Sequence, residues 1–359
     1  MKVKIIGAGS IGNHLANASR LIGWDVVICD QSMDALRRTK DEIYPTRYGS
    51  WDEGIKLEHT NENNKSNASY DLVLIGTPPD SHIQVAIEAV KSSPKALLIE
   101  KPVSGLDFSK IDNLLDLAKK NNVRLFVGYD HIVSESVDYC SKLLIDNSLG
   151  DIDTIDVEFR EHWGGIFNAH PWLEGPWDSY LGFSYRGGGA LGEHSHALNL
   201  WQHFARVSSF GKVHKVQAKM QQVKNEQVDY DSIASLNLIT ETGHLGRCIQ
   251  DVVTLPTKKQ FIIQGKSARI ECTLSPFADE VQIIPTSEGE ITTKVFNKTR
   301  PDDFVKELNH IKDVLNGGAE SPIDLNFGLD TMRVIHAAHK SNISDKTENI
   351  DYNCTFLEL

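Results

Sequence analysis

The chain has 359 residues, of which 40% are hydrophobic and 24% are charged. This length predicts two domains, and the composition excludes collagen-like and wholly disordered chains. With 37 basic and 49 acidic residues, the net charge of -12 argues against binding to nucleic acid or to a membrane surface. The five cysteines form no CxxC pair, so we expect no disulfide framework, no zinc site and a reduced, cytoplasmic protein.

Short apolar runs alternate with helical patterns over the first third of the chain. The predicted strands cover residues 3–6, 26–29, 55–59, 72–75, 96–99 and 123–127. The predicted helices cover residues 11–22, 80–90 and 111–118, and a further helix begins after Ser32. Ser32 and Asp80 are the expected N-caps, and the polar residues 61–69 predict a surface loop. Apolar strands that alternate with helices predict an α/β domain with a parallel, doubly wound sheet.

The pattern changes after about residue 130. A strand over 152–163 and an aromatic, glycine-rich stretch over 164–189 precede a predicted helix over 190–204. Strand-like runs follow at 212–223, 232–240, 244–254, 259–272 and 279–284, and late helices at 304–315 and 329–338. Consecutive strands predict an antiparallel, half-buried sheet. The chain therefore divides into domains at 1–128 and 129–359, with the late helices free to pack back on the first domain.

A glycine-rich loop opens the chain. The residues Gly7-Ala8-Gly9-Ser10-Ile11-Gly12 follow a strand and open a helix, and Asp30 ends the next strand. This arrangement is typical of dinucleotide binding, because the glycines permit a tight turn, approach of a pyrophosphate and close helix packing. The Asp30 carboxylate suits ribose hydroxyls and repels a 2′-phosphate, which favours NAD over NADP. Arg37 and Arg38 lie one or two turns further on, so NADP remains an alternative cofactor. The glycine loop by itself also allows two other interpretations, FAD binding and a turn that binds no cofactor.

Two other strand ends of the first domain carry polar residues. Thr77, Pro78 and His82 follow one strand, and the triplet Glu100-Lys101-Pro102 follows another. Ligands of open parallel sheets bind beyond the carboxyl ends of the strands, so both segments are expected to line the site. From residue type alone, a surface ion pair of Lys101 with Glu100 remains an alternative.

With Gly187-Gly188-Gly189-Ala190-Leu191, these motifs occur in an order that resembles the glucose–fructose oxidoreductase / inositol dehydrogenase / MocA family over nearly the whole chain. The resemblance implies a Rossmann domain followed by an α/β domain on a large, mainly antiparallel open sheet. Such a sheet often forms an oligomer interface in that family, so we expect a homodimer or a homotetramer. The resemblance also implies hydride transfer between a sugar or polyol carbon and NAD(P).

Site residues follow from the resemblance. Lys101 matches the family's lysine between the nicotinamide and the substrate hydroxyl, where it would accept a proton. Tyr129 and Asp130 match a position beside cofactor and substrate, although relatives often have Asn at the second position. The expected cofactor contacts are Gly7, Gly9, Ser10, Ile11, Gly12, Asp30, Thr77, Pro78, His82, Glu100, Lys101 and Tyr129.

The segment after the triple glycine departs from the commonest family pattern. Many relatives carry an acid and a histidine four residues apart, whereas this chain has Glu193 and His196 three apart and Ala197 at the usual histidine position. A spacing of three shares a helix face, so we expect His196 to bind substrate or move a proton, with Glu193 orienting the site. The proton acceptor is Lys101, His196 or a relay of both. Glu193, His194 and His196 could together bind a metal ion, but the sequence specifies no further ligand. We therefore predict no metal site.

The residue types of the second domain predict the chemical class of the substrate. Trp172 and Tyr180 offer aromatic faces for sugar rings, and Arg186 suits a phosphate or carboxylate. The alternative is that these aromatics fill a small core. The leading hypothesis is an NAD-dependent sugar or polyol dehydrogenase, with a nucleotide-linked or modified sugar left open. An NAD-dependent glycosidase and a non-catalytic NAD-sensing protein are the alternatives.

Overall fold

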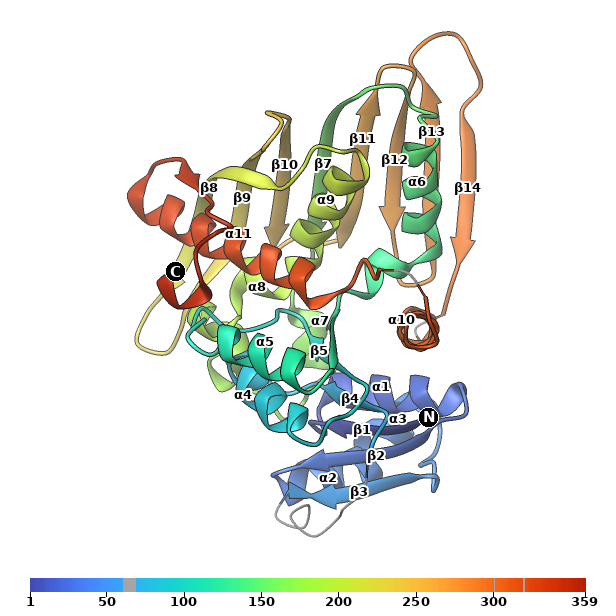
Figure 1. Cartoon of the computed structure of the whole chain (residues 1–359), viewed down its shortest axis with the longest axis vertical. Coiled ribbons are helices and arrows are strands. Elements are labelled where there is room, and N and C mark those ends of the chain that lie inside the picture. Colours follow the sequence, from blue (N-terminus) through green and yellow to red (C-terminus); the bar gives the residue numbers. More distant parts are fainter. Residues whose placement is uncertain (61–68, 300, 319) are drawn as a thin grey trace. The chain divides into compact units, whose positions relative to one another are not determined.

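The computed structural model describes residues 1–60, 69–299, 301–318 and 320–359 (Figure 1). These residues divide into two compact units. The first contains Met1–Asp130, Pro301–Leu325 and Phe356–Glu358, and the second contains His131–Arg300, Asn326–Thr355 and Leu359. Within the described ranges, no helix combines the length and the apolarity that a membrane span requires.

The first unit is built on six parallel strands in the order β3-β2-β1-β4-β5-β6. Along the chain they are β1 (Lys2–Ile6), β2 (Asp25–Asp30), β3 (Ile55–His59), β4 (Leu72–Ile75), β5 (Ala96–Glu100) and β6 (Arg124–Gly128). Every residue of β4 and β5 is buried. Burial on both faces explains why these strands are apolar runs rather than alternating ones. The predicted doubly wound parallel sheet is confirmed.

Helices connect these strands. They are α1 (Ser10–Leu21), α2 (Met33–Arg38), the π-helical η1 (Thr39–Ile43), α3 (Tyr44–Tyr48), α4 (Pro79–Val90) and α5 (Ile111–Lys120). Ser32 caps α2 as predicted, because its hydroxyl accepts a hydrogen bond from the Ala35 amide at 3.2 Å. The predicted cap at Asp80 is wrong: α4 begins at Pro79, whose fixed φ suits a first helical position, and Asp80 lies in the first turn. The predicted loop over 61–69 lies outside the described residues except for residue 69.

Residues 301–325 belong to the first unit although they follow the strands of the second. The helix α10 (Asp302–Leu315) packs on α1, where the Phe304 ring stacks on the His14 ring at a centroid distance of 5.2 Å. After α10, the Ile323 carbonyl accepts a hydrogen bond of 2.9 Å from the Val127 amide at the edge of the sheet. This late segment therefore completes both a helical layer and a sheet edge of the first unit.

The second unit is built on nine strands in the order β14-β13-β12-β11-β7-β10-β9-β8-β15, antiparallel except for β7 with β10. Along the chain they are β7 (Ile152–Arg160), β8 (Val213–Lys224), β9 (Asp229–Thr240), β10 (Leu245–Asp251), β11 (Lys258–Gly265), β12 (Ala268–Leu274), β13 (Ala278–Pro285), β14 (Thr292–Asn297) and β15 (Glu348–Asn349). Figure 1 shows α6 (Glu135–Ile145), α9 (Ser195–Val207) and α11 (Leu325–Ser344) along one face. The predicted large, mainly antiparallel sheet is confirmed.

Two element predictions for this unit are wrong. The single strand predicted over 259–272 is the hairpin of β11 and β12, which turns at Lys266 and Ser267. The sequence does mark this turn, because the polar residues Gly265-Lys266-Ser267 interrupt the apolar run, but the prediction passed over that signal. The single helix predicted over 190–204 is two helices, α8 (Gly189–Glu193) and α9, which are separated at His194.

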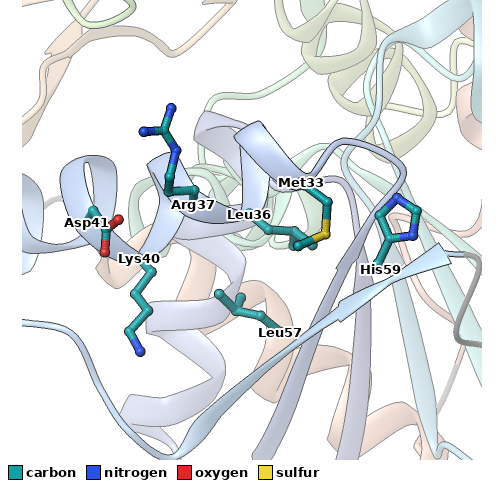
Figure 2. Close-up of a pocket in the computed structure, with 7 residues that line it drawn as sticks. All are labelled: Met33, Leu36, Arg37, Lys40, Asp41, Leu57 and His59. Carbon is teal, nitrogen blue, oxygen red and sulfur yellow. The ribbon is translucent and has the colours of Figure 1, made fainter.

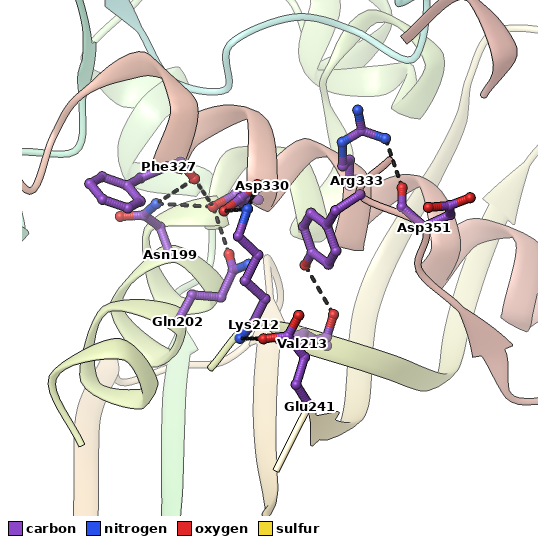
Figure 3. A network of polar contacts seen from close by, with 11 residues as sticks. Asn199, Gln202, Lys212, Val213, Glu241, Phe327, Asp330, Arg333 and Asp351 are labelled. Carbon is purple, nitrogen blue, oxygen red and sulfur yellow. Dashed lines mark hydrogen bonds and ion pairs between the residues drawn. The ribbon is translucent and has the colours of Figure 1, made fainter. Parts of the chain in front are cut away.

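A buried polar network fixes α9 against α11 in the second unit (Figure 3). The Asn199 amide donates to Thr331 Oγ1 at 2.9 Å, and that hydroxyl donates to Gln202 Oε1 at 2.7 Å. On the other side of α9, the Trp201 indole donates to the Ile155 carbonyl of β7 at 2.8 Å. Because buried polar groups need partners, these bonds set the rotation of α9 and the direction of its first turn.

Close backbone approach requires glycine in the first loop. Gly7 has φ +110°, and a Cβ on Gly12 would lie 1.9 Å from the Gly7 carbonyl oxygen. A Cβ on Gly9 would meet no atom within 4 Å. Two glycines of the loop thus serve the packing of α1 on β1, whereas Gly9 faces open space.

These two surroundings predict opposite results for alanine substitution. Gly12→Ala should destabilise the fold by about 1–3 kcal/mol, because the backbone must move to admit the methyl group. Gly9→Ala should change stability by less than ~0.5 kcal/mol but weaken NADH binding, because its methyl group would enter the space left for a pyrophosphate. Urea unfolding and NADH fluorescence titration measure the two effects. Equal stability of the two variants would contradict this division.

Candidate functional site

The glycine loop and Asp30 form one hydrogen-bonded unit at the carboxyl ends of β1 and β2. The Ala8 amide donates to Asp30 Oδ2 at 2.8 Å, and the Ser32 amide donates to Asp30 Oδ1 at 2.8 Å. The first turn of α1 has no side-chain cap. A carboxylate oxygen accepts more than one hydrogen bond, so Asp30 retains capacity for ribose hydroxyls while it holds the loop.

His82 links the two other strand ends that the sequence singles out. Its ring is buried, with Nδ1 at 3.0 Å from the Pro102 carbonyl and Nε2 at 2.7 Å from the Thr77 carbonyl. Burial lowers the pKa of His82 despite these two acceptors. The Lys101–Pro102 peptide bond is cis. His82 therefore positions the segment after β4 against the turn after β5, because its ring contacts a backbone carbonyl of each.

Glu100 is the buried acid of this strand end. It closes β5, pairs with Gly128 in β6, and a Cβ on Gly128 would lie 2.8 Å from its carboxyl group. Burial and the charge of Asp130 raise the pKa of Glu100 to about 8, while Lys101 opposes the shift. Lys101 is half-buried, and Tyr129 is fully buried next to Asp130. The first unit thus gathers Glu100, Lys101, Tyr129 and Asp130 at two adjacent strand ends.

In the second unit, Asp231 holds the triple-glycine loop. Its side chain is buried, with Oδ1 accepting from the Ser184 hydroxyl and Oδ2 from the Leu191 amide, both at 2.7 Å. Gly189 has φ +74°, and a Cβ there would lie 2.2 Å from Asp231 Oδ1. Burial raises the pKa of Asp231, whereas His339 and the two donors act in the opposite direction.

Sequence reasoning missed Asp231, and also Gln250, whose amide donates to the Ala190 and Leu191 carbonyls at 3.2 and 3.3 Å. Both residues lie on strands, β9 and β10, far along the chain from the loop. Their one signal in the sequence is a polar residue within an otherwise apolar, inward-facing row.

Glu193 and His196 occupy different helices. Glu193 ends α8 and His196 lies in the first turn of α9, so the predicted shared helix face does not exist. The Tyr180 hydroxyl lies 3.4 Å from Glu193 Oε2, as its donor. The His196 ring contacts the His131 ring edge-on at a centroid distance of 4.7 Å, a neighbour that sequence reasoning missed. His194, between the two helices, is buried.

The aromatic segment before this loop divides between core and surface. Tyr180 packs against the buried cluster of Trp163, Leu181, Ala190 and Val252, so its ring fills a small core while its hydroxyl reaches Glu193. The Trp172 ring contacts the His170 ring at 5.1 Å, and the Arg186 guanidinium lies 5.8 Å from the centre of the Phe183 ring. Of these three residues, Tyr180 is the one whose hydroxyl is hydrogen-bonded to Glu193.

A separate hollow of about 250 Å³ lies at the edge of the first unit, between α2–η1 and β3. Figure 2 shows its lining by Met33, Leu36, Arg37, Lys40, Asp41, Leu57 and His59. Of the residues proposed for chemistry or for cofactor binding, none lines it. The hollow nevertheless adjoins the Asp30 end of the candidate site, because His59 is the register partner of Asp30 at the carboxyl ends of β2 and β3.

The hydrogen bonds of Asp231 predict a selective defect. Asp231→Asn places an amide nitrogen where one of two donors needs an acceptor, so the variant should lose about 1–3 kcal/mol of stability. The triple-glycine loop and α8, which ends at Glu193, should shift. This shift raises the KM for substrate but leaves the Kd for NADH unchanged. Asp229→Asn is the control, because Asp229 is a partly exposed residue of the same strand that pairs with Lys224. Wild-type stability and KM in Asp231→Asn would contradict the assignment.

Comparisons with known proteins bear on the fold of the chain and on the cofactor of its first unit. Residues 1–129 match the family model GFO_IDH_MocA, "Oxidoreductase family, NAD-binding Rossmann fold". A "Glucose-6-phosphate 3-dehydrogenase" of Bacillus subtilis is 26% identical over 161 residues, which are 45% of this chain and 43% of that protein. The chain spans about two fifths of the length of the curated relatives it matches.

Solved structures extend the similarity of fold to the whole chain. The WlbA dehydrogenase of Bordetella pertussis, in complex with NADH and UDP-GlcNAcA, has a TM-score of 0.73 and 18% identity over 98% of this chain and 99% of its own. A levoglucosan dehydrogenase in complex with NADH and levoglucosan has a TM-score of 0.77 and 17% identity, with coverage of 98% and 99%. Residues 1–129 of this chain thus match the NAD-binding Rossmann domain of the Gfo/Idh/MocA oxidoreductase family, and the solved structures share the fold of the rest.

Proposed function

We propose that this protein is an NAD-dependent oxidoreductase that transfers a hydride between a hydroxyl-bearing carbon of a sugar or polyol and C4 of nicotinamide. One observation carries the proposal: Glu100 ends β5 and Lys101 follows it, at the same edge of the parallel sheet as the glycine loop and Asp30. Ligands of such sheets bind at this edge. A lysine at this place is within the region where a nicotinamide and its reaction partner would meet.

The residues of the first unit fit the cofactor. The N-terminus of α1 carries no side-chain cap, and the exposed Gly9 borders open space, as a pyrophosphate on the helix N-terminus requires. Asp30 would accept hydrogen bonds from the adenosine ribose and repel a 2′-phosphate, which favours NAD over NADP. The bound nicotinamide would supply the acceptor or donor of the hydride.

The proton is assigned to Lys101. In oxidation its neutral amine takes the proton of the substrate hydroxyl, and in reduction its ammonium returns that proton to the carbonyl oxygen. Glu100 lies beside it and is coupled to it electrostatically. His196 is the second candidate for proton transfer, alone or in a relay with Lys101, and its ring already contacts His131.

The sugar class is supported by the names of similar proteins and by the second unit. Those names include a glucose-6-phosphate 3-dehydrogenase, a levoglucosan dehydrogenase and a structure with UDP-GlcNAcA. Trp172 and Tyr180 are half-buried aromatic residues suited to sugar faces, Asp130 suits a hydroxyl, and Arg186 suits a phosphate or carboxylate. We propose that these residues select the substrate, and that the protein acts as a homodimer or homotetramer.

The proposed function is tested with a panel of sugars, polyols, sugar phosphates and nucleotide sugars, with the absorbance of NADH as readout. Substrate-dependent formation of NADH is expected, and the corresponding carbonyl compounds should consume it. Release of a sugar from a glycoside without accumulation of NADH would instead indicate glycosidase activity. Tight NADH binding without turnover of any compound in either direction would contradict the assigned reaction.

Substitution of Lys101 tests whether this residue transfers the substrate proton. Lys101→Met should lower kcat by ~10²–10⁴-fold, because a proton-transfer group is lost, while NADH still binds. Lys91→Met is the matched control, because Lys91 is exposed at the C-cap of α4 and pairs with Glu88. Activity of Lys101→Met above about a tenth of the wild-type value would exclude the assigned role.

The charge of Asp30 sets the expected cofactor preference. Asp30→Asn keeps one oxygen acceptor for the loop but removes the negative charge, so the preference for NAD over NADP should fall by roughly tenfold or more. The ratio of kcat/KM for the two cofactors measures this change. A wild-type enzyme that already prefers NADP would contradict the argument from the ribose.

A further inference from the structure

Two histidines and a carboxylate come together beside the first turn of α9. Asp130, His131 and His196 each offer one imidazole nitrogen or carboxylate oxygen, and these three atoms lie within 4.8 Å of one another. All three side chains are half-buried. The His131 and His196 rings are also in edge-on contact, with a centroid distance of 4.7 Å. Ligand atoms that converge in this way are what a metal site requires.

Local structure fixes where these three side chains lie. Asp130 and His131 are the first two residues of η3 (Asp130–Val133), so one turn of 3₁₀ helix holds the carboxylate next to the imidazole. The His131 ring packs edge-on against the buried Phe159 ring of β7 at a centroid distance of 5.4 Å. His196 lies in the first turn of α9, whose rotation is set by its buried hydrogen bonds to α11 and β7. Ligands held by their surroundings lose little side-chain freedom when they bind an ion.

The ligand types select the kind of ion. Imidazole nitrogens suit Zn²⁺ and other transition metals, whereas Mg²⁺ and Ca²⁺ take oxygen ligands. Two histidines with one carboxylate are a set that catalytic zinc sites use, with a fourth position left for water or substrate. Ligand atoms around Zn²⁺ lie about 3.4 Å apart, so the atoms of this cluster must close by at most roughly 1.5 Å. Rotation of half-buried side chains supplies such a movement.

Sequence reasoning considered a metal with other ligands. It weighed Glu193 and His194 together with His196, whereas the structure brings His196 together with Asp130 and His131. These two residues lie some 65 positions earlier in the chain. A motif of closely spaced ligands therefore does not mark the cluster, which the fold assembles from η3 and α9.

We propose that Asp130, His131 and His196 bind one Zn²⁺ ion, or a similar divalent transition metal, which holds an oxygen of the substrate at its remaining position. The role toward substrate rests on the proposed function, in which a hydroxyl-bearing carbon is oxidised or its carbonyl reduced. A divalent ion stabilises the negative charge of that oxygen once its proton has left. The hydride still passes to nicotinamide and the proton to Lys101, because a His196 that ligates the ion is not available to take it. The ion itself is neither oxidised nor reduced.

Metal binding is tested on full-length protein that carries no histidine tag and has been freed of metal with a chelator. Calorimetric titration with Zn²⁺ should give one ion per chain, and Mg²⁺ in excess should not compete. His131→Ala and His196→Ala should each weaken binding by ~10²-fold or more, because loss of a group that merely orients a ligand already costs ~10–100-fold. Asp130→Asn should weaken it by roughly tenfold, because an amide oxygen replaces the charged ligand. His214→Ala is the matched control, because His214 is exposed on β8.

The wild type decides even where a variant does not fold. In protein with nitrogen-15 in its histidine rings, Zn²⁺ should shift the NMR signals of two imidazoles whose ring protons show a mutual NOE, as the 4.7 Å contact of His131 with His196 requires. A shift of neither ring, or of one ring without the other, would overturn the proposal. So would the absence of a one-to-one Zn²⁺ site, or a site that is unchanged in both His131→Ala and His196→Ala.

Turnover tests the role of the ion at the substrate. With a substrate from the panel, metal-free enzyme should have a kcat/KM lower by ~10²-fold or more, and Zn²⁺ should restore it while the Kd for NADH stays unchanged. Equal turnover with and without bound Zn²⁺ would overturn this role. If the proposed function fails, the wild type is inactive with or without Zn²⁺, but calorimetry and NMR still report on the metal site. The two failures are thus distinguishable.

Discussion

The parallel register of the six-stranded sheet is the constraint on which the candidate site of the first unit depends. Ile6 pairs with both Cys29 and Ile75, Ile75 pairs with Ile99, and Glu100 pairs with Gly128. Because parallel strands end at one edge, the residues just beyond these pairs lie at one level. A slip of a single residue would turn Glu100 to the opposite face of the sheet.

Both units hold a glycine-rich loop by the same means. In the first, the Asp30 carboxylate accepts the Ala8 amide, and in the second, the Asp231 carboxylate accepts the Leu191 amide. Glycine lets the backbone approach or turn closely, but it supplies no side chain that could fix the loop. A carboxylate from a neighbouring strand provides that fixed point, and a charge-assisted hydrogen bond makes it a strong one.

The sequence was most informative where chemistry and periodicity coincide. Asp30, Glu100 and Lys101 could be located because each directly follows a buried apolar run, and the parallel sheet then brings them to one edge. Glu193 and His196 were found as residues, but their shared helix was not, because the break at His194 has no glycine or proline to mark it. Asp231 and Gln250 were missed because the backbone groups that they bind lie some 40 to 60 residues away, beyond the reach of local patterns.

The return of residues 301–325 to the first unit has a consequence for biosynthesis. A ribosome that has released only residues 1–130 has produced every strand of the parallel sheet, but not the helix that packs on α1 or the carbonyl that pairs with Val127. Domains generally fold as units while the chain is made, the N-terminal one first. Here the first unit stays incomplete, with the apolar flank of α1 uncovered, until strands β7 to β14 of the second sheet have been synthesised.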